Sequence, residues 1–178
     1  MRKLTTGIVA GLSTAAVTLA LAGPAHAELY GVDDGNDSPH PSDLYSVSIN
    51  HTESKLVIVT THDDLTPNGS AGGQIFIDTD KADKGPEFVL VGGYFEGTDY
   101  ALLETEGFAT AKWGERVEGG DYRQTVKYGA DKVRTRISTE TLGNPEEVRV
   151  AIRVSGNGKK SVDWLGKARL WTMWLARG

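Results

Sequence analysis

Apolar side chains recur at every second residue in several segments of this chain, and this period constrains the fold more than any other sequence feature. In 148–155, four β-branched residues alternate with Arg149, Ala151, Arg153 and Ser155. Successive side chains of a strand point to opposite faces, so the period predicts a strand with one buried face. A helix would need apolar spacings of three and four, and we predict no helix of ten or more residues.

The same reasoning predicts about nine strands, bounded by Gly, Asp or Pro. They cover 43–49, 55–61, 74–77, 88–91, 100–104, 122–128, 133–138, 148–155 and a last strand within 170–176. A short helical turn is predicted near 140–143, with Thr139 or Thr141 as its cap and Gly143 at its end. We therefore predict an all-β protein: a single antiparallel β-sandwich, immunoglobulin-like or jelly-roll-like.

The first two predicted strands form a hairpin with a short connection at 51–54. If Thr52 faces Lys55, the register places Asp43 opposite Asp64 and Tyr45 opposite His62. Asp43, Asp63 and Asp64 would then lie together at one end of the sandwich, where like charges raise carboxyl pKa values or attract a cation.

The first 27 residues have the composition of a secretory signal peptide. Arg2 and Lys3 precede an apolar run over 7–22, and Ala25 and Ala27 supply the small residues found before a cleavage site. The run is short for a bilayer-spanning helix, so we expect a secreted, extracellular protein and not an integral membrane protein. The predicted organisation is a signal peptide at 1–27, a flexible N-terminal arm at 28–42 and a β-sandwich domain at 43–178.

Net charge and composition exclude several classes of partner and site. The chain has 19 Lys and Arg against 24 Asp and Glu, and removal of 1–27 takes away two cations and no acid, which changes the formal net charge from −5 to −7. A net acidic surface repels phosphates, so we expect no nucleic acid partner. The absence of cysteine excludes disulfides and thiolate metal sites. No loop has phosphate-loop spacing, so we expect no nucleotide, and we expect a monomer.

Three short segments resemble the superfamily of DOMON domains and family-9-type carbohydrate-binding modules. They are the hairpin over 43–59, the Asp-x-Asp turn after Phe76-Ile77 with the later Gly97-Thr98-Asp99-Tyr100, and the strand, Leu142-Gly143 turn and returning strand over 133–152. The resemblance implies a secreted β-sandwich whose relatives bind sugars or haem, or accompany enzymes. Haem-binding members use a Met and His pair, and Met173 is the one methionine beyond residue 27, so we expect no haem.

The turn after 74–77 is the predicted metal site. It carries four carboxylates within ten residues, and calcium prefers six to eight oxygen ligands. We expect calcium, in a structural role, at Asp78, Asp80, Asp83 and Glu87. The alternative is an Asp-rich turn whose side chains accept hydrogen bonds from backbone amides.

Two groups of residues are the predicted ligand contacts. Flat indoles stack on sugar rings, and alternation within 170–175 places Trp171 and Trp174 on opposite faces of the last strand, so we expect Trp164 and Trp174 to contact a ligand. The alternative is that these tryptophans fill the core. Arg134 and Arg136 lie on the polar face of their strand, within a stripe whose guanidinium groups suit acidic polymers. The other members of the predicted stripe are Arg123, Lys127, Arg149 and Arg153.

These features predict a secreted, non-catalytic binding domain for carbohydrate or cell-wall polymer. Two alternatives stay open from the sequence. One is a small extracellular hydrolase that uses carboxylates near Asp63, Asp64 and Asp78, or a Ser-His-Asp arrangement with His51 or His62. The other is a structural or protein-interaction domain of the cell surface.

Overall fold

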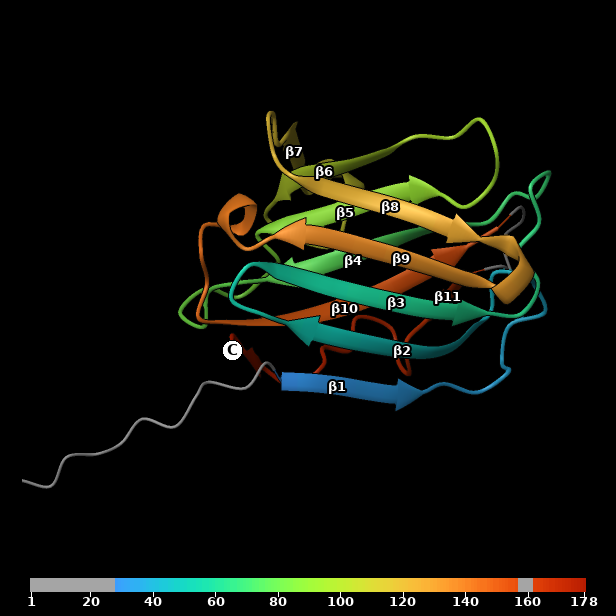
Figure 1. Cartoon of the computed structure of the whole chain (residues 1–178), viewed down its shortest axis with the longest axis horizontal. Helices are drawn as coiled ribbons and strands as arrows, with labels where there is room; N and C mark the ends of the chain where they lie inside the picture. Colours follow the sequence, from blue (N-terminus) through green and yellow to red (C-terminus); the bar gives the residue numbers. More distant parts are fainter. Residues whose placement is uncertain (1–27, 157–161) are drawn as a thin grey trace, which may run out of the picture.

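The protein is a sandwich of two antiparallel β-sheets, described here from a computed structural model that covers residues 28–156 and 162–178. The front sheet in Figure 1 has the strand order β1-β2-β3-β9-β8. The second sheet lies behind it with the order β11-β10-β4-β5-β6-β7, and β12 adds to β10. The prediction of an all-β sandwich is confirmed, and the predicted signal peptide at 1–27 lies outside the described residues.

The strands of the front sheet are β1 (Glu28–Asp33), β2 (Leu44–His51), β3 (Lys55–His62), β8 (Tyr122–Lys127) and β9 (Lys132–Ser138). Those of the second sheet are β4 (Gly72–Asp78), β5 (Phe88–Gly93), β6 (Tyr100–Thr105), β7 (Trp113–Arg116), β10 (Glu147–Ser155), β11 (Val162–Trp164) and β12 (Leu175–Ala176).

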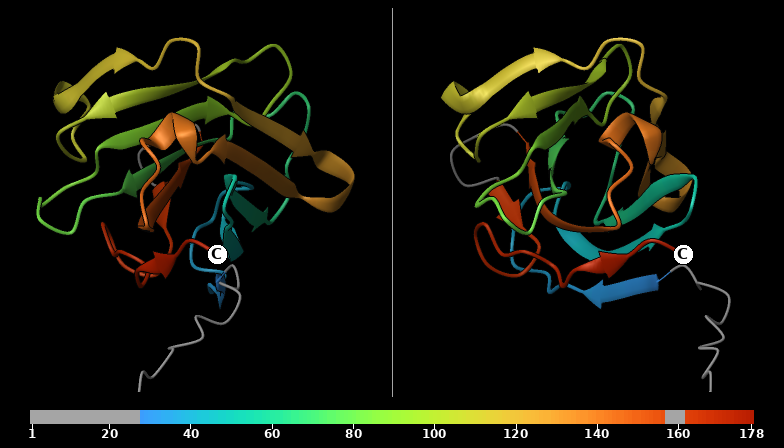
Figure 2. Two further views of the ribbon diagram at one scale, coloured as in Figure 1. Left: turned by 60° about the vertical axis from the view of Figure 1, so that its left-hand side comes forward. Right: turned by 90° about the vertical axis from the view of Figure 1, so that its left-hand side faces the viewer.

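The main core lies between the two sheets, which Figure 2 shows as two layers seen from the side. It is built from alternate residues of each long strand, as the period of two requires. The residues of β10 that point into the core are the predicted ones, and β9 contributes Val133 and Ile137. Its fully buried members include Ile49, Ile58, Ile75, Ile77, Leu90, Leu102, Ile137, Val148, Val150, Ile152 and Val154.

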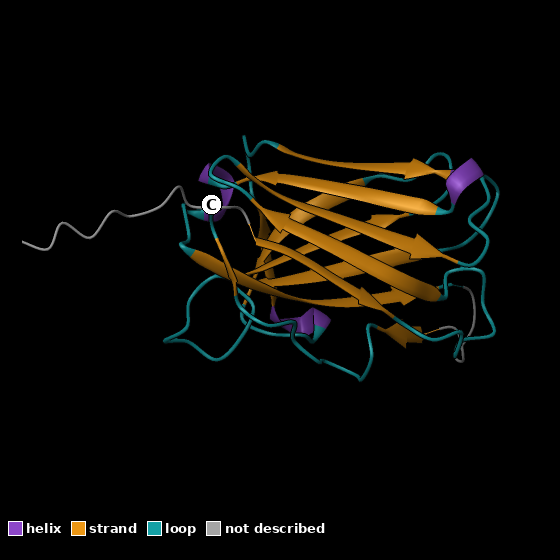
Figure 3. Cartoon of the chain, turned by 60° about the horizontal axis from the view of Figure 1, so that its bottom comes forward, coloured by secondary structure: helices purple, strands orange, loops and turns teal. Residues whose placement is uncertain are grey.

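Three single helical turns lie at the ends of the strands (Figure 3): η1 (Thr110–Lys112), η2 (Tyr128–Ala130) and η3 (Glu140–Leu142). The predicted turn near 140–143 is η3, and Gly143 ends it with φ of 82°. Thr139 is the N-cap residue, one of the two predicted, but its side chain makes no capping hydrogen bond. The Ser138 hydroxyl accepts the Thr141 amide at 3.1 Å. Within 28–156 and 162–178, no helix is long and apolar enough to cross a membrane.

Part of the predicted flexible arm is a strand. β1 pairs antiparallel with β2, from Glu28 opposite His51 to Asp33 opposite Ser46. Tyr30 and Val32 pack against the core, whereas Leu29, between Glu28 and Tyr30, is 69% exposed. The arm prediction is therefore wrong for 28–33.

The predicted hairpin register holds over most of β2 and β3 and then changes. His51 faces Leu56 and Ser46 faces Thr61, as predicted, but a bulge between Leu44 and Ser46 places Leu44 opposite His62. The extra residue reverses the alternation, because it turns Leu44 into the core alongside Val47. The prediction that Tyr45 faces His62 is wrong for this reason.

The predicted strand over 170–176 is mostly an irregular segment. Only Leu175 and Ala176 pair with β10, so the predicted alternation of side chains through 170–175 does not occur. Thr172 also bonds to β10 at Val150: its backbone amide donates to the Val150 carbonyl at 2.9 Å, and its hydroxyl accepts the Val150 amide at 3.0 Å. Two short strands, β7 and β11, were not predicted, since each has too few residues to show a period.

Candidate functional site

Arg134 and Arg136 lie side by side with two further cations on the outer face of the front sheet. They are alternate residues of β9, and register places Arg136 opposite Arg123 of β8 and Arg134 opposite Thr125. On the other side of β9, Lys55 of β3 lies opposite Ser138. Lys55, Arg123, Thr125, Arg134 and Arg136 line a hollow of about 350 Å³.

The cationic surface continues along the same two strands. Lys127 faces Lys132 in the β8–β9 register, and both side chains are exposed. We call this surface the cationic face, and its members are Lys55, Arg123, Lys127, Lys132, Arg134 and Arg136. Its one ion pair among the described residues joins Arg136 to Asp121 at 2.8 Å. The face therefore holds more positive charge than nearby acids neutralise.

The predicted arginine stripe is divided between the two sheets. Arg149 and Arg153 lie on β10, where Arg153 donates to Gln74 at 2.7 Å and Arg149 forms an ion pair with Asp78 at 2.6 Å. Sequence reasoning found Arg123, Lys127, Arg134 and Arg136, but it missed Lys55 and Lys132. Lys55 begins the neighbouring strand β3, and strand order is not visible in the sequence.

Trp164 lies on the outer face of the second sheet and contacts other aromatic residues. Its ring stacks on Phe76, with centroids 6.0 Å apart and an interplanar angle of 14°. The ring centroid of Phe108 lies 4.7 Å from that of Phe76 and 5.2 Å from that of Trp171. These rings form a second, smaller core with the buried residues Phe76, Val89 and Ala151, so packing accounts for Trp164.

Trp174 is half-buried and holds the side chain of Arg149. The guanidinium carbon of Arg149 lies 4.7 Å from the Trp174 ring centroid and 4.9 Å from that of Trp171. The Lys81 ammonium lies 5.3 Å from Trp174. Because Trp164 and Trp174 belong to the second sheet and its C-terminal segment, the four predicted ligand residues do not form one site.

A second hollow, of about 420 Å³, opens at one end of the second sheet. Its lining includes the paired glycines of β4 and β5, with Gln74, Tyr100 and Trp113. The Trp113 indole nitrogen is buried and has no hydrogen-bond partner. This hollow offers aromatic rings and little charge, in contrast to the cationic face.

Among the described residues, no three carboxylates of the predicted metal turn lie within 4.8 Å of one another. Asp78 is bound by Arg149, and Glu87 accepts the Thr79 amide at 2.5 Å. Asp80 accepts the Ala82 amide at 2.8 Å, and Asp83 accepts the Lys84 amide at 2.6 Å. Burial raises the pKa of Asp78 and of Glu87. The turn follows the alternative interpretation, in which its carboxylates accept backbone amides.

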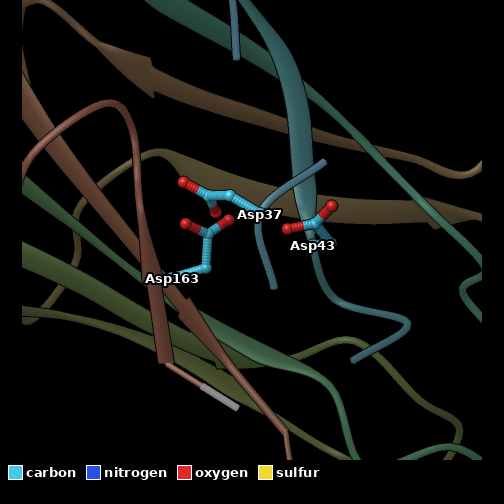
Figure 4. Close-up of side chains that lie close together, drawn as sticks. All are labelled: Asp37, Asp43 and Asp163. Atoms are coloured by element: carbon cyan, nitrogen blue, oxygen red, sulfur yellow. The ribbon is translucent and has the colours of Figure 1, made fainter. Parts of the chain in front are cut away.

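Three other carboxylates converge, those of Asp37, Asp43 and Asp163 (Figure 4). One oxygen from each lies within 4.8 Å of the others, and no other three acidic or histidine side chains come as close within 28–156 and 162–178. Burial raises the pKa of Asp163 to about 6 and also raises the pKa of Asp43. Sequence reasoning grouped Asp43 with Asp63 instead, whereas Asp63 accepts the Tyr45 hydroxyl at 2.5 Å.

The hydrolase alternative has little geometric support. His51 and His62 are buried, with exposed fractions of 0% and 1%. His62 lies between the Thr60 hydroxyl at 2.7 Å and the Ser42 carbonyl at 2.9 Å. A general base must reach a proton of the substrate, and these two rings are closed to solvent. Asp63 and Asp78 are engaged by different partners, Tyr45 and Arg149.

Comparisons with known proteins do not assign this chain to a family. No protein-family model matches the sequence, and no curated protein matches it at a significant level.

Proposed function

We propose that this protein is an extracellular, non-catalytic binding domain that holds an anionic polysaccharide or cell-wall polymer on its cationic face. The observation that carries the proposal is the β8–β9 register, which places Arg123 opposite Arg136 and Lys127 opposite Lys132. Like charges directly opposite one another destabilise a sheet. An anionic ligand across both strands offsets that repulsion.

The chemistry of the face favours carboxylate or phosphate groups. Three of its six cations are arginines, and a guanidinium binds both oxygens of such a group in a fixed fork. The hollow of about 350 Å³ beside Arg123, Arg134 and Arg136 has room for one charged sugar unit or phosphate. A long polymer suits this sheet face because the cations are spaced along the strands, so its binding needs no deep pocket.

The location outside the cell rests on the predicted signal peptide and stays a prediction. It agrees with the chemistry, since extracellular polymers bearing carboxylates or phosphates meet an exposed protein face directly. The formal charge of the whole chain is −5, so attraction must come from the local cationic face and must weaken with salt.

The test compares polymer binding by two charge-matched variants. The first, Arg123→Gln with Arg134→Gln, removes two cations from the face. The control, Lys84→Gln with Lys167→Gln, removes two exposed cations outside the face. Binding to polygalacturonate and to poly(glycerol phosphate) is measured by calorimetry, with neutral dextran as a comparison polymer.

We expect the face variant to bind either anionic polymer about tenfold more weakly or worse, because each lost charged hydrogen bond costs roughly 1.5–3 kcal/mol. The control variant should bind like the natural protein, and salt should weaken binding in both. Equal losses in the two variants, binding to dextran as strong as to the anionic polymers, or no binding to either anionic polymer would contradict the proposal. A third variant, Trp113→Ala, reports whether any dextran binding uses the second hollow.

A further inference from the structure

The convergence of Asp37, Asp43 and Asp163 joins parts of the chain that are distant in sequence. Asp37 lies between β1 and β2, Asp43 immediately precedes β2, and Asp163 is the middle residue of β11. β2 belongs to the front sheet and β11 to the second sheet. Figure 4 shows the three carboxylates facing one another where these elements meet. The contact therefore spans both layers of the sandwich.

Asp43 is fully buried and still lacks a partner for one oxygen. Its exposed fraction is 0%, and Oδ1 accepts the Ser38 amide at 2.8 Å. Oδ2 is buried with no hydrogen-bond partner, and so is the hydroxyl oxygen of Ser38, a residue that is itself 8% exposed. Buried oxygens without a partner are costly, and these two lie in the short segment that carries two of the three acids.

The described residues supply no positive charge to this cluster. None of their Lys, Arg or His side chains forms an ion pair with Asp37, Asp43 or Asp163. Asp163 instead accepts the Leu44 amide at 2.8 Å through Oδ2. Three converging carboxylates with so few neutral donors are stable only with a shared proton or a cation between them.

We propose that Asp37, Asp43 and Asp163 bind a calcium ion that fastens the β2 end of the front sheet to β11 of the second sheet. All donors are oxygens, as hard cations require. Magnesium keeps most of its water and binds through one or two carboxylates, whereas calcium accepts several protein oxygens in a flexible arrangement. Three carboxylates gathered within 4.8 Å, two of them buried, therefore suit calcium. The buried Oδ2 of Asp43, which has no hydrogen-bond partner, is the oxygen that such an ion would satisfy.

The test titrates calcium chloride, and separately magnesium chloride, into the chelator-treated protein. Binding is measured by calorimetry and the melting temperature by scanning calorimetry. Asp37→Asn removes the exposed member of the cluster, so this variant keeps the buried packing. Asp83→Asn is the matched control, because it removes one exposed aspartate from the turn after β4.

We expect one calcium per chain and a rise in melting temperature of about 5 °C or more at 100 times the dissociation constant. Asp83→Asn should respond equally, and Asp37→Asn should bind at least tenfold more weakly. No heat of calcium binding would overturn the proposal, and a more stable Asp43→Asn variant would then show that the carboxylates share a proton. Equal losses in the two aspartate variants, or magnesium binding as tight as calcium, would overturn it as well.

Discussion

Arg123 of β8 lies directly opposite Arg136 of β9, so two guanidinium groups stand side by side on the outer face of the front sheet. Asp121 bonds to Arg136 at 2.8 Å, whereas Arg123 has no ion pair among the described residues. The strand register therefore produces electrostatic repulsion in the front sheet, at the place where we propose that a polyanion binds.

Replacing Arg123 by threonine should therefore stabilise the free protein. Threonine suits a strand, and removal of a like-charge pair is worth about 0.5 kcal/mol in the free energy of unfolding. Urea denaturation measures the change, which should shrink in concentrated salt because salt screens exposed charges. The same variant should bind polygalacturonate more weakly. A variant that is less stable at every salt concentration would show that Arg123 has a structural role.

The ion pair between Arg149 and Asp78 should be the most costly one to break. Asp78 has no exposed side-chain surface, and the guanidinium of Arg149 lies over the rings of both Trp171 and Trp174. Arg149→Met should cost about 3 kcal/mol or more, because it leaves a buried carboxylate without its partner. The double variant Asp78→Asn, Arg149→Met should recover part of this loss. Denaturant unfolding provides both values, and additive losses in the double variant would contradict the coupling.

His62 should make the protein less stable as the pH falls. Burial lowers the pKa of His62 from its ordinary value of 6.5 to about 4. Between these values the unfolded chain binds a proton that the native protein does not, so stability is lost as the pH falls through this range, and is fully retained above 6.5. The loss of unfolding free energy contributed by His62 should approach about 3 kcal/mol at a pH of about 4.

A His62→Gln variant isolates this effect. Burial also lowers the pKa of His51 and raises that of several carboxyl groups, and these groups are present in both proteins. The measurement is the difference in unfolding free energy between the natural protein and the variant, from neutral pH down to about pH 4. That difference should fall with pH, and a constant difference would contradict the assignment.

Gly73 should tolerate no side chain, because it lies against the buried ring of Tyr94. A Cβ atom at Gly73 would overlap the Tyr94 hydroxyl oxygen and the ring carbon that carries it. Gly73→Ala should cost about 2 kcal/mol or more in unfolding free energy, as overpacking forces the ring or the strand to move. Gly129 is the matched control, since a Cβ atom there would have no neighbour within 4 Å. Gly129→Ala should change stability by less than about 0.5 kcal/mol, and equal losses at the two positions would contradict the packing argument.

Local patterns predicted the strands well where a strand is long enough to show its period. β3, β9 and β10 lie within a residue or two of the predicted ranges, because each buries one face and the alternation is visible in the sequence. The bulge at Leu44 and the two-residue strand β12 were not predictable in this way. The bulge depends on an inserted residue, and β12 depends on pairing with a strand that is distant in the sequence.

The candidate sites show the same division. Arg134 and Arg136 were predicted because they alternate with core residues of one strand, whereas Lys55 joins them only because β3 pairs with β9. The aspartates of the turn after β4 are neighbours in sequence but accept their own backbone amides. Asp43 and Asp163 lie near opposite ends of the described chain, and no local pattern relates them.

The order of polar and apolar residues by itself determined that this chain forms strands with one buried face, since side-chain direction along a strand follows directly from backbone geometry. Which strands become neighbours was decided only in the tertiary structure, where packing of the two sheets and the bulge in β2 select one arrangement. That arrangement placed six cations on one face and three carboxylates at one edge, because charge clusters arise from distances in space and not from distances along the chain.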